Sequence, residues 1–328
     1  MENSILWLNK NDVESLLDMK GTLKVVEEAF RQHGLKKVQM PPKLYLFFKK
    51  HNGDLRTMPA YLEEQDITGV KIVNVHPDNP KKGLPTVMAL VILNSTETGA
   101  PIAIMDGTHL TDMRTGAAGG VAVKHLARKN SKTVGFVGAG NQAKTQLLAI
   151  NEVIDIEEIK VTSISEKGTL AFKREMEKRT GCDIIPKRSI KEVCDCDILV
   201  TTTPSREPIV KDEWISEGTH INAIGADAPG KEELDPMILK RARVVVDDIP
   251  QASHSGEVNV PLSKKIITEK DICCEIGEVV AGRKKGRTKD SDITVFDSTG
   301  LAIQDVATAD LVYRKALKEN MGIKLQQF

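Results

Sequence analysis

The chain has 328 residues, more than the roughly 250–300 at which a single hydrophobic core tends to split, so its length predicts two domains. It carries 46 basic and 46 acidic side chains, and this balance argues against a polyanion such as nucleic acid as its main partner. Only 4% of the residues are aromatic, and no run approaches the ~18 apolar residues of a membrane span. We expect a soluble, cytoplasmic protein without a nucleic-acid or membrane partner.

Five cysteines, an odd number, fit a reducing compartment better than a disulfide framework. One residue separates Cys194 from Cys196, and Cys273 and Cys274 are adjacent, so neither pair has the CxxC spacing of a zinc site. No histidine pair lies nearby at ligand spacing. We therefore expect cysteines that pack as small apolar side chains, and no metal.

The first third of the chain combines a helical segment with several strands. Residues 10–34 place apolar side chains on one helical face, and strand-like runs follow at 43–48, 69–75 and 86–93. The turn NSTETGAP then leads into a further short run, IAIMD. Thr111 is a typical N-cap residue, so we expect a helix over DMRTGAAGGVAVKHLARK, with basic residues at its end.

From Lys132 onward, strands and helices alternate. The runs TVGFVGAG, EIKVTSI, CDILVTTT, THINAIG, RVVVDD and ITVFDSTG are rich in Val and Ile, which is typical of parallel strands buried on both faces. The last segment, 301–320, has a helical pattern and could return to the first domain. We therefore expect an α/β protein in which a doubly wound parallel sheet at 118–300 is inserted into an α+β domain at 1–117 plus 301–328.

A glycine-rich turn joins the first of these later strands to a helix. The order is strand, Gly138-x-Gly140-x-x-Ala143, helix. The first glycine permits a tight turn, the second lets the backbone approach a pyrophosphate, and the helix N-terminus supplies N–H donors. The motif alone is weak, but its position at the start of an alternating series predicts a Rossmann-type dinucleotide site. A tight turn without a ligand is the alternative.

The end of the next strand indicates which dinucleotide binds. NAD enzymes usually place Asp or Glu there, against the ribose 2′-hydroxyl. In this chain Ser163 occupies that position, with Ser165 and Lys167 close by. Hydroxyls and an ammonium tolerate the 2′-phosphate that a carboxylate would repel, so the sequence leans towards NADP. Glu166 could serve NAD instead if the strand ended later.

The first domain offers cations for an anionic substrate. Lys43 and Arg56 lie near strands, and Lys71 lies inside the apolar run ITGVKIVNV, where a desolvated ammonium has a lowered pKa suited to proton transfer. A buried stem whose head reaches solvent is the alternative for Lys71. Arg114 would lie in the first turns of a helix and could hold an anion together with free N–H groups. His76 precedes a proline and is more typical of a turn than of a base.

The sequence INAIGADAPGK places one acid, Asp227, directly after a strand of the parallel sheet. Ligands of doubly wound sheets bind outside the carboxyl ends of the strands, so Asp227 should lie at the nicotinamide end of the crevice. A carboxylate there could move a proton or hold an amine, and we interpret Asp227 as a catalytic group. The alternative is a turn residue among Ala, Pro and Gly.

Several segments together resemble a known family. KIVNVHPDNPKKGLPTVMALVILNSTETGAPIAIMDGTHLTDMRTGAAGG, FVGAGNQA, VTTTPS, THINAIGADAPGKEELD and VFDSTGLAIQDVA, in this order, are similar to the ornithine cyclodeaminase/mu-crystallin family over essentially the full length. The likeness is greatest to the archaeal-type alanine dehydrogenases of that family. It implies a homodimer in which the outer domain binds substrate and forms the dimer, while the Rossmann domain binds NAD or NADP.

The resemblance also implies roles for individual residues. Lys71 matches an active-site lysine that donates or accepts a proton, Asp227 a catalytic aspartate, and Arg114 an arginine that contacts carboxylate and cofactor. Lys43 stands where cyclodeaminases tend to have Arg, and with Arg56, Lys71 and Arg114 it is expected to bind the substrate. Cofactor contacts are expected from Arg114, Thr115, Gly138, Ala139, Gly140, Asn141, Gln142, Ser163, Ser165, Lys167, Thr202, Thr203, Gly225, Ala226, Asp227, Lys231 and Ser298.

Two positions depart from the family pattern. Cyclodeaminases carry a Glu that is expected to handle the amine of ornithine, whereas this chain has Arg56 in RTMP, as the alanine dehydrogenases do. An arginine there would repel a diamine, which argues against ornithine cyclisation. Ser163 in place of an acidic ribose contact argues against strict use of NAD.

The resemblance favours an NAD(P)-dependent amino-acid dehydrogenase that catalyses the reversible oxidative deamination of L-alanine to pyruvate and ammonia. Two other enzymes are alternatives: a reductase of cyclic imines such as pyrroline-2-carboxylate, and an ornithine cyclodeaminase. A non-enzymatic alternative is an NADPH-binding protein like mu-crystallin. The set of Lys71, Arg114 and Asp227 favours an enzyme, because binding alone needs no buried lysine facing an acid.

Overall fold

The computed structural model describes residues 4–326, which divide into two compact units. The first unit consists of Met1–Arg114 and Leu301–Phe328, and the second of Thr115–Gly300. Helix α3, Thr108–Leu126, contains this division as well as the expected boundary at 117/118. Among the described residues, no helix is long and apolar enough to cross a membrane.

The first unit is built on a sheet of eight strands with three helices of its own. The sheet runs in the order β16-β1-β7-β6-β5-β4-β2, with β3 paired to β4, and only the β1–β7 pair is parallel. Its elements are β1 Ser4–Leu8, α1 Lys10–Leu16, α2 Met19–Gly34, β2 Val38–Gln39, β3 Leu44–Phe48, β4 Gly53–Leu62, β5 Ile67–Val75, β6 Val87–Asn94, β7 Pro101–Asp106, α11 Ala302–Glu319 and β16 Ile323–Gln326, with short 3-10 turns at Lys49–His51 and Asn79–Lys82.

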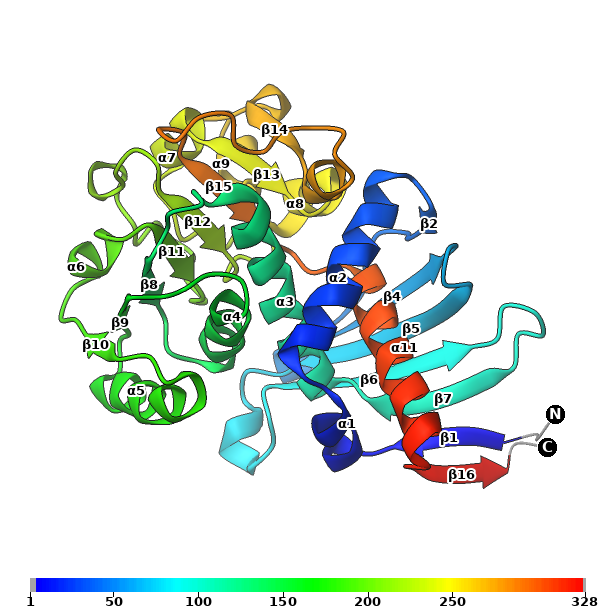
Figure 1. The fold of residues 1–328 in the computed structure, drawn as a ribbon. Coiled ribbons are helices and arrows are strands. Elements are labelled where there is room, and N and C mark those ends of the chain that lie inside the picture. The colour runs from blue at the N-terminus through cyan, green and yellow to red at the C-terminus, as the bar shows by residue number, and fades with distance from the viewer. Residues whose placement is uncertain (1–3, 327–328) are drawn as a thin grey trace. The chain divides into compact units, whose positions relative to one another are not determined.

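Helices cover one face of this sheet. α2 and α11 pack against each other, and α11 lies across β4, β5 and β6 (Figure 1). Strand residues alternate between the two faces, so Met58 and its cross-strand partner Lys71 point to the same side and are both buried. The expected strands around Lys71 are therefore present, and the C-terminal helix α11 is part of this unit.

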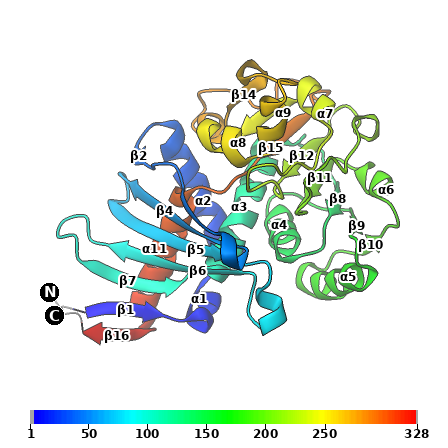
Figure 2. The same cartoon turned by 180° about the vertical axis from the view of Figure 1, so that it is seen from behind.

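The opposite face of the sheet carries exposed apolar side chains. Viewed from behind, the strands lie in front of α11 (Figure 2). Cross-strand pairing aligns Leu44, Thr57, Ile72 and Leu90 in one row across β3, β4, β5 and β6. Leu44 and Leu90 are 55% and 42% exposed, and Leu46 and Met88 in the next row are also exposed.

The structure corrects two details of the helices. Residues 10–34 do not form one helix, because Leu17 is extended and Asp18 begins a new helix by accepting a hydrogen bond from the Gly21 N–H at 2.6 Å. Helix α3 begins at Thr108 rather than after Thr111. Asp106 accepts from the N–H groups of Thr108 and His109, and the Thr111 hydroxyl donates to the Gly107 carbonyl inside the helix.

The second unit is a parallel sheet of eight strands. The strands lie in the order β10-β9-β8-β11-β12-β15-β13-β14, and all neighbouring pairs are parallel. From β8 the chain builds the sheet first towards β10 and then, from β11 onward, towards the other edge, as in doubly wound folds. Its elements are β8 Thr133–Val137, α4 Asn141–Asn151, β9 Glu158–Thr162, α5 Glu166–Thr180, β10 Ile184–Pro186, α6 Ile190–Cys194, β11 Ile198–Thr201, β12 His220–Ala223, α7 Pro236–Arg241, β13 Arg243–Val246, α8 Ile249–Ser255, α9 Asn259–Ser263, β14 Ile272–Glu275, α10 Ile276–Val280 and β15 Thr294–Asp297, with 3-10 turns at Asp212–Trp214 and Glu269–Asp271.

Two separate apolar cores lie on the two faces of this sheet. Along β11, Leu199 belongs to one core, whereas its neighbours Ile198 and Val200 belong to the other. Each strand residue alternates sides, so both faces are buried and the strands read as continuous apolar runs. This confirms the expected parallel sheet. The sequence analysis did not identify the short edge strands β10 and β14.

Candidate functional site

Three charged side chains form a buried cluster in the first unit. The Lys71 ammonium donates to Asp305 Oδ1 at 2.7 Å, and Arg114 Nε donates to the same oxygen at 2.9 Å. Arg114 Nη1 also donates to Gln304 Oε1 at 3.0 Å. Lys71 is 1% exposed and Asp305 is fully buried, so the Lys71 head does not reach solvent in the described chain.

Each member of this cluster comes from a different element. Lys71 lies on the covered face of β5, Arg114 in the second turn of α3, and Asp305 in the first turn of α11. Arg114 lies in the first turns of a helix, as expected. It does not lie among the free N–H groups of the helix start, because α3 begins six residues earlier. Asp305 was missed altogether. An acid at i+3 of a helix start looks like ordinary helix chemistry in a sequence.

The pKa of Lys71 is lowered from its ordinary value to about 7, chiefly by burial. The charges of Arg114 and Lys43 also lower the pKa, whereas the charge and the hydrogen bond of Asp305 raise it. A lysine with this pKa exchanges a proton near neutral pH, as a general acid or base requires. The expectation of a desolvated Lys71 is confirmed.

Arg56 lies on the same covered face, 8% exposed, and stacks over the Tyr45 ring at 5.3 Å. Asp54 accepts from its guanidinium at 2.9 and 3.1 Å. This pair offsets the charge of Arg56, so repulsion of a diamine is weaker than a lone arginine would exert. His76 packs its ring where a side chain on Gly53 would lie, in agreement with a turn histidine.

The glycine turn of the second unit has the geometry that a dinucleotide needs. Gly138 has φ +108°, and a Cβ there would lie 2.5 Å from the Thr202 hydroxyl. A Cβ on Gly140 would meet no atom within 4 Å, which leaves room for a pyrophosphate. Gly140 is also the N-cap of α4 and supplies no side-chain cap. The residues present therefore fit a dinucleotide phosphate at this helix start.

Strand β9 ends at Thr162, so Ser163 is the first residue beyond it. Its hydroxyl donates to the Ser165 carbonyl at 2.9 Å and lies 2.9 Å from the Thr169 hydroxyl. Glu166 begins α5 and is exposed. The strand does not extend to Glu166, which leaves Ser163 at the position that contacts the ribose in Rossmann domains.

Asp227 lies in the loop that follows β12. Its Oδ1 accepts from Lys231 Nζ at 2.6 Å, and its side chain is 41% exposed. The Asp227 N–H donates to the Gly225 carbonyl, so the backbone turns at this point. The loop is tight at Gly225, where a Cβ would lie 2.1 Å from the Thr203 carbonyl oxygen. Asp227 therefore stands at the carboxyl edge of the sheet on a closely fixed loop.

Buried carboxyl groups support this edge of the sheet, and the sequence analysis did not identify them. Glu233 accepts from the N–H groups of Thr203 and Gly225 at 2.6 and 2.9 Å and from the Thr201 hydroxyl at 2.7 Å. Glu257 in turn accepts from the Glu233 N–H at 2.8 Å. Burial raises the pKa of both acids. In residues 4–326, no group of three or more His, Cys, Asp or Glu side chains is arranged to hold a metal ion.

Ser298, expected on the nicotinamide side, follows β15. Its hydroxyl is buried and has no hydrogen-bond partner within residues 4–326. A buried hydroxyl normally has a partner, so this one fits a polar group of a ligand.

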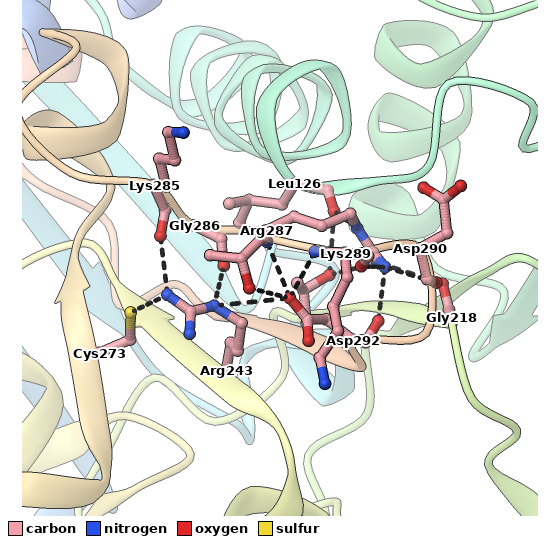
Figure 3. Close-up of polar contacts among 12 residues, drawn as sticks. Leu126, Gly218, Arg243, Cys273, Lys285, Gly286, Arg287, Lys289, Asp290 and Asp292 are labelled. Atoms are coloured by element: carbon pink, nitrogen blue, oxygen red, sulfur yellow. Dashed lines mark hydrogen bonds and ion pairs between the residues drawn. The ribbon is translucent and has the colours of Figure 1, made fainter.

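A second cluster of charges lies at the amino ends of the strands and serves structure (Figure 3). Arg287 donates to the carbonyls of Leu126, Gly218 and Asp292, and Arg243 donates to those of Lys285 and Gly286. Arg243 also contacts Cys273 Sγ at 3.0 Å. Because ligands of such sheets bind at the opposite, carboxyl edge, this cluster is not part of the candidate site.

Comparison with known proteins identifies the family. The sequence model described as the ornithine cyclodeaminase/mu-crystallin family matches residues 3–320. The chain belongs to this family.

Individual family members are similar over nearly their whole length. An alanine dehydrogenase of Archaeoglobus fulgidus is 56% identical over 324 residues, covering 98% of each chain. The solved structure of an archaeal alanine dehydrogenase dimer with bound NAD has a TM-score of 0.96 at 56% identity, covering 99% of this chain and 100% of that one. A Thermococcus litoralis Δ1-pyrroline-2-carboxylate reductase, solved with NADH and L-proline, has a TM-score of 0.95 at 43% identity, covering 98% and 100%.

Proposed function

We propose that this member of the ornithine cyclodeaminase/mu-crystallin family catalyses the reversible NAD(P)-dependent oxidative deamination of L-alanine: L-alanine, NAD(P)⁺ and water give pyruvate, ammonium, NAD(P)H and a proton. The observation that carries the proposal is Lys71, a buried lysine with a pKa of about 7 beside Arg114 and Asp305. The 56% identity to an alanine dehydrogenase supports the choice of substrate.

In this proposal the first unit is the substrate-binding domain. Arg114 and Lys43 bind the alanine carboxylate, with Arg56 as a further cation on the same covered face as Lys71. Neutral Lys71 accepts a proton as the C2–N bond is oxidised. After hydride removal, the water that attacks the iminium carbon gives a proton to Asp227, or to Lys71 once Lys71 has released its first proton to solvent. That proton is then returned to the amino group, which leaves as ammonia, and the remaining hydroxyl loses its proton to solvent to give pyruvate.

The second unit is the dinucleotide-binding domain. The turn from Gly138 to Gln142 and the start of α4 hold the pyrophosphate, and the bound nicotinamide supplies the hydride acceptor. Thr115, Thr202, Thr203, Ala226, Lys231 and Ser298 are proposed as further contacts to the cofactor. Ser163, Ser165 and Lys167 contact the adenosine ribose and favour NADP at least as much as NAD. Five free cysteines are consistent with a cytoplasmic enzyme.

One assay tests the reaction and its closest competitor. Purified protein is given pyruvate with ammonium, or pyrroline-2-carboxylate, each with NADH and with NADPH. We expect the largest kcat/KM with pyruvate and ammonium. The pyrroline-2-carboxylate reductase similarity supports the cyclic imine as the second candidate, and a larger kcat/KM for that imine would replace alanine as the substrate.

Ornithine provides the third arm of the assay. Asp54 offsets the charge of Arg56, so the argument against cyclisation rests on the missing Glu at this position. We expect no proline or ammonia from ornithine above background. Their formation with catalytic amounts of cofactor would show that Arg56 does not exclude a diamine.

We also propose a homodimer, which the dimeric structure of an archaeal relative supports. We place its interface on the open face of the first sheet because of the apolar side chains exposed there. The face presents Leu44, Leu46, Met88 and Leu90, which water contacts in the single chain. Leu46→Lys should yield monomers in size-exclusion chromatography with light scattering. Leu170→Lys, at a leucine 45% exposed in the second unit, should leave the dimer intact. A dimeric Leu46→Lys variant would exclude this interface.

A further inference from the structure

Asp305 binds both buried cations of the cluster in the first unit, Lys71 and Arg114. One of its carboxylate oxygens, Oδ1, accepts from both Lys71 Nζ and Arg114 Nε, at 2.7 and 2.9 Å. The other, Oδ2, is buried and has no hydrogen-bond partner within residues 4–326. The carboxylate thus joins β5 and α3 to the start of α11 through a single oxygen.

The charges around Lys71 make the Asp305 carboxylate the group that keeps a proton on Lys71. Arg114 on α3 and Lys43 before β3 both disfavour the protonated lysine, and Arg56 on β4 lies on the same covered face, already paired with Asp54. Asp305 is the group that favours the protonated form. Without Asp305, the Lys71 and Arg114 cations would be buried with no carboxylate to offset their charges, and such uncompensated buried charge is strongly unfavourable.

We propose that Asp305 is a positioning residue of the reaction, which holds Lys71 Nζ and the Arg114 guanidinium in fixed relative places and determines when Lys71 gives up its proton. The proposal rests on the function proposed above for its link to catalysis. Its structural part, the control of Lys71, does not depend on which substrate reacts.

Gln304 makes a distinct contribution. Its Oε1 accepts from Arg114 Nη1 at 3.0 Å and from the Leu301 N–H at 3.2 Å, and within the described residues the hydrogen bond of Lys71 goes to Asp305 and not to Gln304. Gln304→Leu should therefore weaken binding of the substrate carboxylate through Arg114, seen as a higher KM. It should leave the titration of Lys71 unchanged. The two neighbouring residues thus separate carboxylate binding from proton transfer.

The direct test measures the Lys71 titration without turnover. Protein labelled with ¹³C at lysine Cε is titrated by NMR, and the Lys71 signal is assigned by its loss in Lys71→Met. The wild-type midpoint should lie at about pH 7. Asp305→Asn removes the charge that favours the ammonium, so its midpoint should fall by at least about one unit, the low end for a charge at this distance. An unchanged midpoint would overturn the proposal.

A matched control comes from the same helix. Asp310 is 7% exposed and pairs with Arg314 at 2.8 Å. Asp310→Asn removes another buried acid of α11 but should not move the Lys71 midpoint. A shift as large as that of Asp305→Asn would mean that any loss of charge or stability in α11 acts on Lys71, and the specific role of Asp305 would be wrong.

Activity provides the second readout. The neutral lysine is the active base in alanine oxidation, so the acid limb of the kcat/KM profile should move to lower pH in Asp305→Asn by the same amount as the NMR midpoint, with kcat/KM reduced at least tenfold at its plateau. A uniform loss without a shift of the limb is the result expected of a merely structural residue.

Asp305→Glu keeps the charge and displaces it by one methylene, and it carries the test if the Asn variant does not fold. Its midpoint should remain near the wild-type value while kcat/KM falls at least tenfold, and unchanged kcat/KM would overturn the positioning role. Failure of the proposed function looks different. A wild type that does not oxidise alanine would show the normal Lys71 titration and its normal response to Asp305→Asn.

Discussion

In the first unit, one buried carboxylate is shared by two cations; in the second, a series of buried carboxylates binds backbone N–H groups. Asp305 accepts from Lys71 and Arg114 side chains. Glu233 and Glu257 accept from the backbone after β11 and β12 and from the segment that carries Glu233 itself. Asp247, after β13, accepts from the N–H groups of Thr299 and Gly300 at 2.6 and 2.7 Å.

The difference reflects what each region has to hold. A parallel sheet leaves its loops at the carboxyl edge without ladder partners, so carboxylates that accept two or three N–H groups fix these loops around a ligand. In the first unit the buried carboxylate of Asp305 binds side chains and not the N–H groups of a loop, so it can influence proton transfer by Lys71. Buried acids thus stabilise loops in one unit and tune a lysine in the other.

The largest expected effect concerns Asp227, the exposed acid among these buried ones. If it is an acid or base of the reaction, Asp227→Asn should lower kcat by roughly 10²–10⁴-fold. The NAD(P)H dissociation constant should change little, because the glycine turn and the start of α4 hold the pyrophosphate. kcat, nucleotide affinity and Tm are measured on the same preparations. Near-wild-type turnover would reduce Asp227 to a turn residue and leave Lys71 as the catalytic group.

Glu233→Gln tests whether the buried acids of the second unit hold its loops. The amide keeps the size of the side chain but turns an NH₂ group towards N–H donors, so the free energy of unfolding should fall by about 1–3 kcal/mol. Nucleotide binding should also weaken, because the amide keeps only one oxygen and either the Thr203 or the Gly225 N–H loses its acceptor. Glu157→Gln, at an exposed acid paired with Lys132, should change stability by less than about 1 kcal/mol. Equal effects of the two substitutions would contradict the loop-holding role.

The pH dependence of stability should have opposite signs in the two units. Burial raises the pKa of Asp297 to about 8, so between about pH 4 and 8 the folded state keeps a proton that the unfolded state has lost. Its contribution therefore falls as pH rises. The pKa of Lys71 is about 7 in the folded state and about 10.5 in the unfolded state, so between about pH 7 and 10.5 only the unfolded state holds this proton. The contribution of Lys71 to the free energy of unfolding therefore rises as the pH rises through that range.

Each of these groups changes the free energy of unfolding by at most about 1.4 kcal/mol per pH unit. Denaturant unfolding at a series of pH values should show a shallower fall below pH 8 in Asp297→Asn and a shallower rise above pH 7 in Lys71→Met. Identical slopes in Asp297→Asn and the wild type would mean that Asp297 ionises normally in the folded protein.

The smallest expected effect is on cofactor choice. NADPH should bind at least as well as NADH, and Ser163→Asp should favour NADH by about tenfold, since the new carboxylate repels a 2′-phosphate and can bind the 2′-hydroxyl. Nucleotide fluorescence titrations give both constants. Glu166→Gln should leave NADH affinity unchanged, because Glu166 lies in α5 beyond the strand end. A wild type that does not bind NADPH would contradict the role of Ser163.

Much of the fold followed from local patterns. Runs of Val and Ile predicted the central parallel strands, and the glycine motif predicted the helix start that follows β8. Patterns failed where a single side chain changes the backbone: Asp18 divides the segment 10–34 into two helices, and Asp106 starts α3 before Thr111. β4 was missed, although it pairs with three neighbouring strands, because GDLRTMPAYL lacks a clean apolar alternation.

The sequence by itself favoured a buried Lys71, since a charge inside an apolar run is unusual at the surface, and a dinucleotide site after β8. Only the tertiary structure excluded a Lys71 head that reaches solvent. Only the tertiary structure decided which acid accompanies that lysine. Asp305 lies 234 residues away along the chain, and its place beside Lys71 depends on α11 packing across β4 to β6. The same holds for Glu233 and Glu257, whose buried partners are backbone N–H groups. Every residue except proline carries such a group, so no sequence pattern distinguishes the ones that a fold leaves unpaired.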